Sequence, residues 1–257
     1  MGRGQPQFSI TIDENMKIQF LGTGTALSKS RGWSSFVIND SILVDPPPDV
    51  THSLRTVQID PASIKTILIT HFHADHYFGM PFLLLELFYF RPGCSDTVKL
   101  VAPSKANEKI ATLMSLAYED VVRDTPEILD ILDIHHFQDQ SEIIINGVSI
   151  IPYLVNHNNI EAYALKLNDG IKVLSFTGDT GMCSQLKELV YDADLLIAEM
   201  SNIENTSPDH LNYQDIITLK DVMGSNKIVI ATHIRDKAPD CKEIIFANDY
   251  DKYEFGG

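Results

Sequence analysis

Four residues that can bind metal ions stand within six consecutive positions of this chain, in the segment HFHADH: His71, His73, Asp75 and His76. The segment follows the apolar run TILIT at 66–70 and precedes the apolar run FLLLELFYF at 82–90. In extended backbone alternate residues share a face, so His71 and His73 can bind one ion together, and Asp75 and His76 follow where the chain turns. Imidazole and carboxylate without thiolate are typical of zinc, manganese or iron in hydrolytic or redox sites. The segment therefore predicts a metal centre at the end of a strand.

Short apolar runs along the rest of the chain predict strands at 17–22, 34–39, 41–45, 66–70, 98–102, 142–146, 149–155, 162–167, 172–178, 194–199 and 227–232. Helical patterns occupy 103–120 and 213–224, and 82–90 has the composition of a buried helix. Many strands followed by alternating strands and helices predict an α/β sandwich. Because no linker divides the chain, we expect an N-terminal tail over 1–16 and a single domain over 17–257.

The formal net charge of -15 bears on the partners of this protein. Proteins that hold polyanions present a basic stripe, whereas the Lys and Arg residues here are scattered singly. Extended nucleic acid is therefore disfavoured as a partner, although an acidic protein can still bind a small anion at metal ions.

The cysteines and the first residues of the chain indicate the cellular compartment in which the protein works. Cys94, Cys183 and Cys241 are odd in number and widely spaced, so neither a disulfide framework nor a thiolate zinc cluster is expected. The first residues lack the apolar core of a signal peptide, and no window approaches the roughly 18 apolar residues of a membrane span. We expect a cytoplasmic protein that does not enter a membrane.

The HFHADH segment resembles the HxHxDH signature of the metallo-β-lactamase superfamily. The family's third histidine, bridging aspartate and last histidine each follow a strand, and this chain offers His157 in VNHNN, Asp179 in FTGDT and His233 in IVIATHI. The resemblance covers about 17–257 and implies a four-layer αββα sandwich of the metallo-β-lactamase type. It also implies two divalent metal ions, with Zn²⁺ expected and Mn²⁺ an open alternative. The implied ligands are His71, His73 and His157 for one ion, Asp75, His76 and His233 for the other, and Asp179 as the bridge.

Two differences between this chain and other branches of the superfamily reduce the number of activities that we expect. The β-lactamases carry a cysteine where this chain has Asp179, and the flavo-diiron proteins carry a glutamate where it has His73. Antibiotic hydrolysis and oxygen or nitric oxide reduction are therefore not expected. Phosphodiesterases, glyoxalase II-type thioester hydrolases and lactonases remain.

Two further features favour a phosphodiesterase. FLGTG at 20–24 resembles the start of the RNase Z and PhnP-like phosphodiesterase branch. In that branch a glutamate and a later histidine, matched here by Glu199 and His210, form a relay beside the metals. The resemblance implies that a metal-bridging hydroxide, hydrogen-bonded to Asp75, attacks the phosphorus while His210, oriented by Glu199, protonates the departing oxygen.

The substrate prediction rests on what the chain lacks. The tRNA-processing enzymes of this branch carry a protruding arm between the third histidine and the bridging aspartate, and only 21 residues separate His157 from Asp179. The branch's glycine-rich segment is replaced by DPPPD at 45–49. We therefore expect a small phosphodiester substrate, with a cyclic nucleotide favoured. The alternatives are a tRNA 3′-processing endonuclease of the RNase Z type, a thioester or lactone hydrolase on the same site, and a binding protein that only sequesters a ligand.

Several residues stay outside the pattern. His52, His135 and His136 match nothing in it, and Arg235 and Lys237 are interpreted as solvated charges that could also reach a phosphate. Apolar helical segments between 77 and about 140 could cap the pocket or pair two copies, and we expect a homodimer.

Overall fold

Two seven-stranded sheets form the centre of the molecule in the computed structural model, which describes residues 15–91, 97–204, 206–224, 226–235 and 241–256. The first sheet has the order β14-β1-β2-β3-β4-β5-β6. Its strands are β1 (Asn15–Gly22), β2 (Ser35–Ile38), β3 (Ile42–Val44), β4 (Thr66–Leu68), β5 (Val98–Ala102), β6 (Leu132–His136) and β14 (Lys252–Gly256). The second has the order β13-β12-β11-β10-β9-β8-β7. Its strands are β7 (Ile143–Ile145), β8 (Val148–Leu154), β9 (Tyr163–Asn168), β10 (Val173–Phe176), β11 (Leu195–Glu199), β12 (Ile228–Thr232) and β13 (Ile245–Phe246).

Both sheets follow one plan, in which an antiparallel part continues into a parallel part. In the first sheet the strands from β14 to β3 pair antiparallel and those from β3 to β6 pair parallel. In the second, β7 to β10 are antiparallel and β10 to β13 are parallel. Parallel strands need a crossover, usually helical, and this is where most helices stand.

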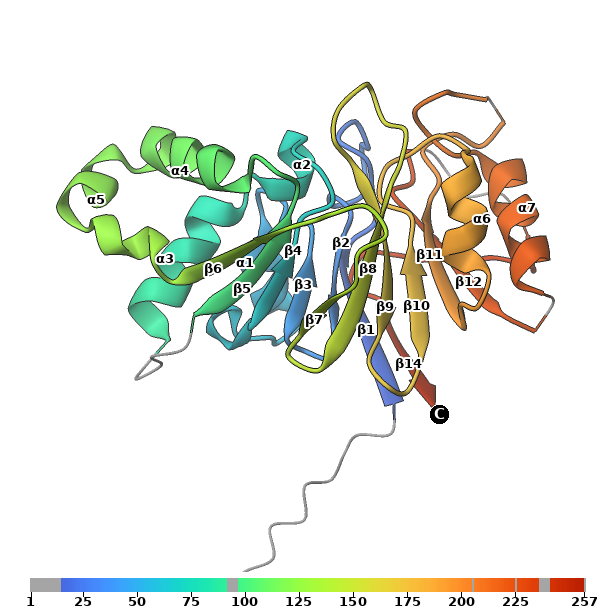
Figure 1. Cartoon of the computed structure of the whole chain (residues 1–257), viewed down its shortest axis with the longest axis horizontal. Coiled ribbons are helices and arrows are strands. Elements are labelled where there is room, and N and C mark those ends of the chain that lie inside the picture. Colours follow the sequence, from blue (N-terminus) through green and yellow to red (C-terminus); the bar gives the residue numbers. More distant parts are fainter. Residues whose placement is uncertain (1–14, 92–96, 205, 225, 236–240, 257) are drawn as a thin grey trace, which may run out of the picture.

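Helices cover the outer face of each sheet (Figure 1). The first sheet carries α1 (Val50–Thr56), α3 (Met80–Phe90), α4 (Ala106–Ala117) and α5 (Glu119–Asp124), and the second carries α6 (Ser184–Val190) and α7 (Tyr213–Met223). The short helices are α2 (Ala74–Tyr77) and the 3₁₀ turns Pro61–Ser63 and Pro126–Leu129. The layers are therefore helix, sheet, sheet and helix, as the sequence predicts.

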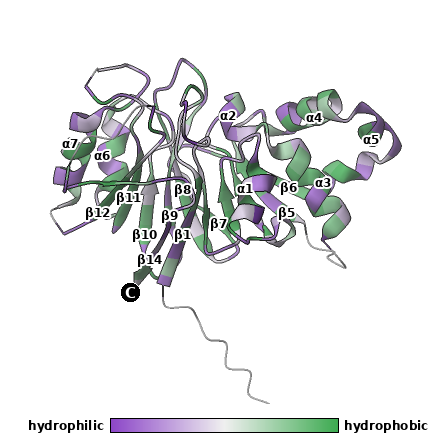
Figure 2. Cartoon of the chain, turned by 180° about the vertical axis from the view of Figure 1, so that it is seen from behind, coloured by the Kyte–Doolittle hydropathy of each residue, from purple (hydrophilic) through white to green (hydrophobic). Residues whose placement is uncertain are grey.

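The strands can sit between two layers because both of their faces are apolar. In β1, Ile18 and Phe20 pack into the core between the sheets, whereas Leu21 packs toward the helices. In β11, Ile197 faces the inter-sheet core and Leu196 faces α6 and α7. A strand buried on both faces reads as a continuous apolar run, which explains why these segments stand out in the sequence. Figure 2 shows hydrophobic residues gathered along the strands of both sheets.

The structure corrects some predicted boundaries. Strand β1 begins at Asn15, and Met16 is fully buried, so the last two residues of the predicted tail belong to the first sheet. The rest of that tail, residues 1–14, lies outside the described residues. The edge strands β6 and β14 were not predicted because their exposed positions interrupt the apolar pattern. No described helix is long and apolar enough to cross a membrane, and the apolar α3 has 11 residues.

Candidate active site

Polar residues follow several strands where the two sheets open at one edge, the upper edge in Figure 1. His71 and His73 come after β4, and α2 begins at once behind them, with His73 at its N-cap and Asp75 in its first turn. This change from extended chain to helix directs Asp75 and His76 to a different position from that of the two preceding histidines. The other candidates stand in the loops after β8, β10 and β12.

The structure brings all seven predicted metal ligands together. The ligand atoms of His71, His73 and His157 lie within 4.8 Å of one another, and so do those of Asp75, His76 and His233. These are the two groups that the resemblance implied.

Asp179 lies between the two groups. Its Oδ2 atom is 3.5 Å from His76 Nε2, 3.3 Å from His233 Nε2 and 3.9 Å from His157 Nε2. One carboxylate oxygen within reach of histidines from both groups is the geometry expected of a bridging ligand.

A buried aspartate orients two of the histidines. Asp45 accepts hydrogen bonds from Thr70 Oγ1 at 2.8 Å and from His76 Nδ1 at 3.0 Å. Because the Thr70 hydroxyl donates to Asp45, it accepts from His71 Nδ1 at 3.1 Å. Both rings therefore carry the proton on Nδ1 and leave Nε2 for the site, which is how partners behind a metal-binding histidine select its tautomer.

His157 and His233 are fixed in the same way from the second sheet. His157 Nδ1 donates to the carbonyl oxygen of Asp209 at 2.9 Å, and His233 Nδ1 lies 2.8 Å from Ser201 Oγ. His73 is the exception, because its Nδ1 faces the site and lies 3.0 Å from His157 Nε2. Two ring nitrogens at this distance require a shared cation or a proton between them.

The donor set fits divalent metal ions. The Nε2 atoms of His71, His76 and His233 are buried and make no hydrogen bond. An unsatisfied buried polar atom is costly, and three of them converging on two carboxylates have a common explanation in bound cations. Imidazole and carboxylate are ligands for zinc and for manganese alike.

The charges of the site suit cations as well. Burial opposes ionisation of Asp179, but His233 and His76 outweigh it and hold the pKa of Asp179 well below its ordinary value. Burial also opposes the charge on Asp75, yet the neighbouring rings of His233 and His76 lower the pKa of this carboxyl too. Burial, reinforced by His76, lowers the pKa of His71. Two ionised carboxylates and a neutral imidazole are the forms that bind metals.

His210 and Glu199 form a second unit beside this cluster. His210 Nδ1 lies 2.8 Å from Glu199 Oε1, and the fully buried Glu199 also accepts backbone N–H groups of Thr180, Ser201 and Leu211. Burial lowers the pKa of His210, but the hydrogen bond and charge of Glu199 outweigh burial and raise it above its ordinary value. The His210 ring is thus held through Nδ1, with its Nε2 edge turned away from Glu199.

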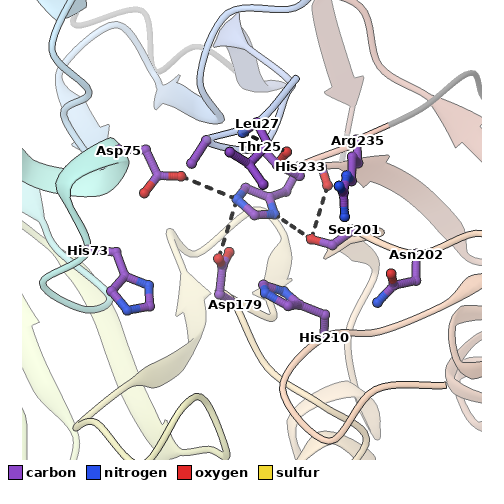
Figure 3. A pocket seen from close by; sticks show the side chains of 11 residues that line it. Thr25, Leu27, His73, Asp75, Asp179, Ser201, Asn202, His210, His233 and Arg235 are labelled. Atoms are coloured by element: carbon purple, nitrogen blue, oxygen red, sulfur yellow. Dashed lines mark hydrogen bonds and ion pairs between the residues drawn. The ribbon is translucent and has the colours of Figure 1, made fainter. Parts of the chain in front are cut away.

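A pocket of about 170 Å³ opens over both units. It is lined by Thr25, Ala26, Leu27, His73, Asp75, Asp179, Ser201, Asn202, His210, His233 and Arg235. Figure 3 shows the His233 ring between Asp75 and Asp179 on one side and Ser201 on the other, with His210 beside Asp179. A substrate in this pocket reaches the candidate metal ligands and His210 at the same time.

Residues outside the predicted pattern are mostly outside the pocket as well. His52 is exposed in α1, and His135 and His136 lie in β6, with His135 paired to Asp133. Arg235, by contrast, lines the pocket. Lys237 and Cys94 lie outside the described residues, and Cys183 and Cys241 are free thiols.

Sequence reasoning missed the residues behind the histidines. Asp45 was given no role in the site, although it directly follows β3 and so shares the strand-end position of the predicted ligands. Ser201, two residues after β11, shares it as well. The position just after a strand, which marks the predicted ligands, could have identified both Asp45 and Ser201. The pocket residues Leu27 and Asn202 carry no such signal.

Comparison with solved structures places the fold. The metallo-β-lactamase fold protein YhfI from Bacillus subtilis superposes with a TM-score of 0.75 at 18% identity, covering 93% of this chain and 99% of YhfI. The short form of human tRNase Z has the same TM-score at 19% identity, with the same coverage of each chain. A diphosphatase from the PhnP family has a TM-score of 0.72 at 20% identity, covering 93% of this chain and 98% of its own. The predicted metallo-β-lactamase fold is confirmed.

Sequence relatives agree with the predicted branch. Ribonuclease Z of Pyrobaculum islandicum is 24% identical over 258 residues, covering 87% of this chain and 88% of that protein. The protein Rv1339 of Mycobacterium tuberculosis is 33% identical over 143 residues, which are 55% of this chain and 50% of the relative. The match with this mycobacterial relative thus spans half of its length. The predicted class, a metal-dependent hydrolase, agrees with the ribonuclease and diphosphatase among these proteins.

One family model covers nearly the whole described domain. It is described as the anti-Pycsar protein Apyc1 and matches residues 16–248, a range that contains all seven candidate metal ligands, Glu199 and His210. This chain belongs to the Apyc1 family, within the metallo-β-lactamase fold.

Proposed function

We propose that this protein is a dinuclear metal-dependent phosphodiesterase that hydrolyses a small phosphodiester, with a cyclic nucleotide as the favoured substrate. The observation that carries the proposal is the 2.8 Å contact between His210 and Glu199, because His210 lines the same pocket as several of the candidate metal ligands, namely His73, Asp75, Asp179 and His233. The fold alone does not select this activity, because many chemistries share it.

The metal ions would be held by the two histidine groups and bridged by Asp179. When bound, two divalent ions would activate water at neutral pH and neutralise charge on the phosphate. Asp75 borders both the pocket and the second group, since its Oδ2 lies 3.7 Å from His233 Nε2 and 3.5 Å from His76 Nε2. Being ionised, it accepts a hydrogen bond from the attacking water and orients it toward the phosphorus.

His210 supplies the proton that the leaving oxygen needs. A ribose alkoxide is a poor leaving group unless it is protonated as it departs. Glu199 raises the pKa of His210 and fixes the ring through Nδ1, so that the protonated form is favoured and Nε2 can donate into the pocket. A thioester releases a thiolate, which departs unaided, and a lactone alkoxide stays tethered. Neither requires this pair.

The described chain between His157 and Asp179 argues against a tRNA substrate. It consists of the loop 158–162, the strands β9 and β10 and the turn between them, and it contains no further helix or strand from which an arm could be built. The net charge of -15 also disfavours a polyanion. Membership of a family described as anti-Pycsar supports a cyclic nucleotide. Ribonuclease Z remains the name of several relatives, so tRNA cleavage is the second candidate.

A substrate panel with the metal-loaded protein tests the proposal. Cyclic AMP, bis(p-nitrophenyl) phosphate, a glutathione thioester and a precursor tRNA are compared at equal enzyme concentration, with Asp179→Ala as the inactive control. We expect turnover of the two small phosphodiesters only. Thioester turnover as the dominant activity, or specific tRNA 3′-end cleavage at a matching rate, would overturn the assignment.

Three further points belong to the proposal. Zn²⁺ is the proposed native metal, which metal analysis of the purified protein tests. A homodimer is proposed because Phe82, Tyr89 and Phe90 of α3 are 44%, 57% and 65% exposed, and sedimentation equilibrium tests it. A cytoplasmic location is proposed because two described cysteines are free thiols, as suits a reducing compartment. Fractionation of the source cells tests the location.

A further inference from the structure

We propose that Leu27 and Asn202 form a recognition site for a nucleobase beside the metal centre. The inference rests on the proposed function and deepens it, because it says which part of the substrate the pocket selects. Both residues line the pocket over the candidate metal ligands, and neither has a role in binding metal or moving protons.

The loop that carries Leu27 is rigidly anchored at its base. Asp249 accepts the backbone N–H of Thr23 at 2.8 Å through Oδ1 and that of Gly32 at 2.6 Å through Oδ2. A Cβ atom on Gly24 would lie 2.7 Å from Arg31 Cβ, so the two arms of the loop approach too closely for any other residue at this position. The FLGTG segment therefore has a definite task, which is to fold the loop back on itself.

The same loop is tied to the segment that carries His233. Ile234 donates its backbone N–H to Thr23 O at 2.8 Å, and Ser28 Oγ donates to Ile234 O at 2.8 Å. Leu27 is held inside the loop by a hydrogen bond from its own N–H to Thr25 Oγ1 at 3.2 Å. The position of Leu27 relative to the metal centre is thus set before any substrate binds.

Leu27 presents an unused apolar surface to the pocket. The residue is 70% exposed, and it belongs to none of the apolar clusters of the described chain. Figure 3 shows Leu27 and Thr25 on one side of the His233 ring and Asn202 beyond Ser201 and His210. A flat apolar group above the phosphate position would cover Leu27.

Asn202 supplies the complementary polar surface. Its backbone N–H is bonded to Leu211 O at 3.3 Å, whereas its side-chain amide makes no hydrogen bond within the described residues. Arg235 also lines the pocket. An amide offers one acceptor and two donors, which match the edge of a nucleobase.

These two surfaces together select a planar ring with a polar edge. An acyl chain would cover Leu27 but would leave the amide of Asn202 without a partner, which is costly once water is excluded. A bare sugar phosphate would reach the metals and His210 without touching Leu27. A nucleobase satisfies both surfaces, with its face against Leu27 and its edge toward Asn202.

The test compares a cyclic nucleotide with ribose 3′,5′-cyclic phosphate, which lacks the base. For Leu27→Ala we expect KM for the cyclic nucleotide to rise about tenfold, the scale of a lost apolar contact in a binding pocket, with kcat little changed. Asn202→Ala should raise the same KM by a similar factor. Neither variant should change KM for the base-free substrate, and Leu27→Met should restore the wild-type value.

Leu116→Ala is the matched control, because Leu116 is 80% exposed on α4 and lies outside the pocket. Binding of a phosphorothioate cyclic nucleotide that resists hydrolysis gives a second readout, independent of turnover. Weaker binding by Leu27→Ala supports base recognition even if cyclic nucleotides are not hydrolysed. Unchanged KM and binding in both variants, equal losses on the base-free substrate, or no binding by the wild-type protein would overturn the inference.

Discussion

Removing the imidazole of His210 is the perturbation that best separates a phosphodiesterase from the other hydrolases of this fold. The substitution is His210→Ala, and the comparison is between a cyclic nucleotide and bis(p-nitrophenyl) phosphate. The first substrate releases a ribose oxygen that needs a proton. The second releases nitrophenolate, which departs without one. A general acid therefore matters for the first substrate and hardly at all for the second.

The expected magnitude follows from the position of His210. General acid catalysis contributes about 10²–10⁴-fold to a rate. The His210 side chain is 25% exposed, so water in the pocket can partly replace it as a proton donor. We therefore expect a loss in the lower half of that range, about 10²–10³-fold in kcat on the cyclic nucleotide, or about 2.7–4 kcal/mol of barrier. The loss on the nitrophenyl ester should stay within about threefold, since no proton transfer is removed.

The assay is steady-state kinetics on both substrates with metal content measured for each preparation. The fold should survive, because Glu199 keeps its three backbone donors when the imidazole is gone. Equal losses on both substrates would mean that His210 binds phosphate or supports the metals, and no loss on either would remove the case for an acid. Glu199→Gln should show the same preference more weakly. It should also lower stability, because both oxygens of Glu199 accept backbone N–H groups and an amide nitrogen must oppose one of them.

Three other predictions concern the metal centre. Asp179→Ala should abolish turnover while far-UV circular dichroism stays unchanged, because no other carboxylate of the described residues pairs with histidines of both groups. Near-normal activity after metal loading would remove Asp179 from the centre. Asp45→Asn should weaken metal affinity about 10–100-fold in a competition titration, because His76 loses the carboxylate that orients its ring. Unchanged affinity would show that Thr70 and the backbone are sufficient to orient the histidines. Metal analysis should give two ions per chain, and loading both sites at 100 times Kd should raise the thermal midpoint by about 10–20 °C. One ion per chain, or an unchanged thermal midpoint, would contradict the prediction of two metal sites.

The clustering of the seven candidate ligands was predictable because their signal is local. Each of His71, His157, Asp179 and His233 follows an apolar strand, and the chain order of the ligands matches a known pattern. The strands themselves were visible because burial on both faces removes polar residues from them. Local composition and order were sufficient to place seven side chains that come from distant parts of the chain.

The supporting residues were hidden because their roles depend on tertiary contacts. Asp45 meets Thr70 and His76 across 25 and 31 positions, and Ser201 meets His233 across 32. Nothing in DPPPD indicates that its first carboxylate is almost completely buried. Leu27 was unpredictable for the opposite reason: an exposed leucine in a loop looks like any other, and only the pocket gives it a meaning.

The strongly acidic composition of this protein is compatible with the proposed anionic substrate, because the net charge of the surface and the local charge of the pocket act over different distances. Across the surface, a net charge of -15 repels a long polyanion, which must place many phosphates near the protein at once. Inside the pocket, the carboxylates Asp75 and Asp179 are partners for cations, while His210 and Arg235 add positive charge at the wall. A molecule with one phosphate therefore meets the local positive charge of the loaded site and little of the distant repulsion, because exposed charges are screened beyond about 8–10 Å at physiological salt. The same electrostatics that disfavour tRNA would thus leave the proposed substrate, a small phosphodiester, free to bind.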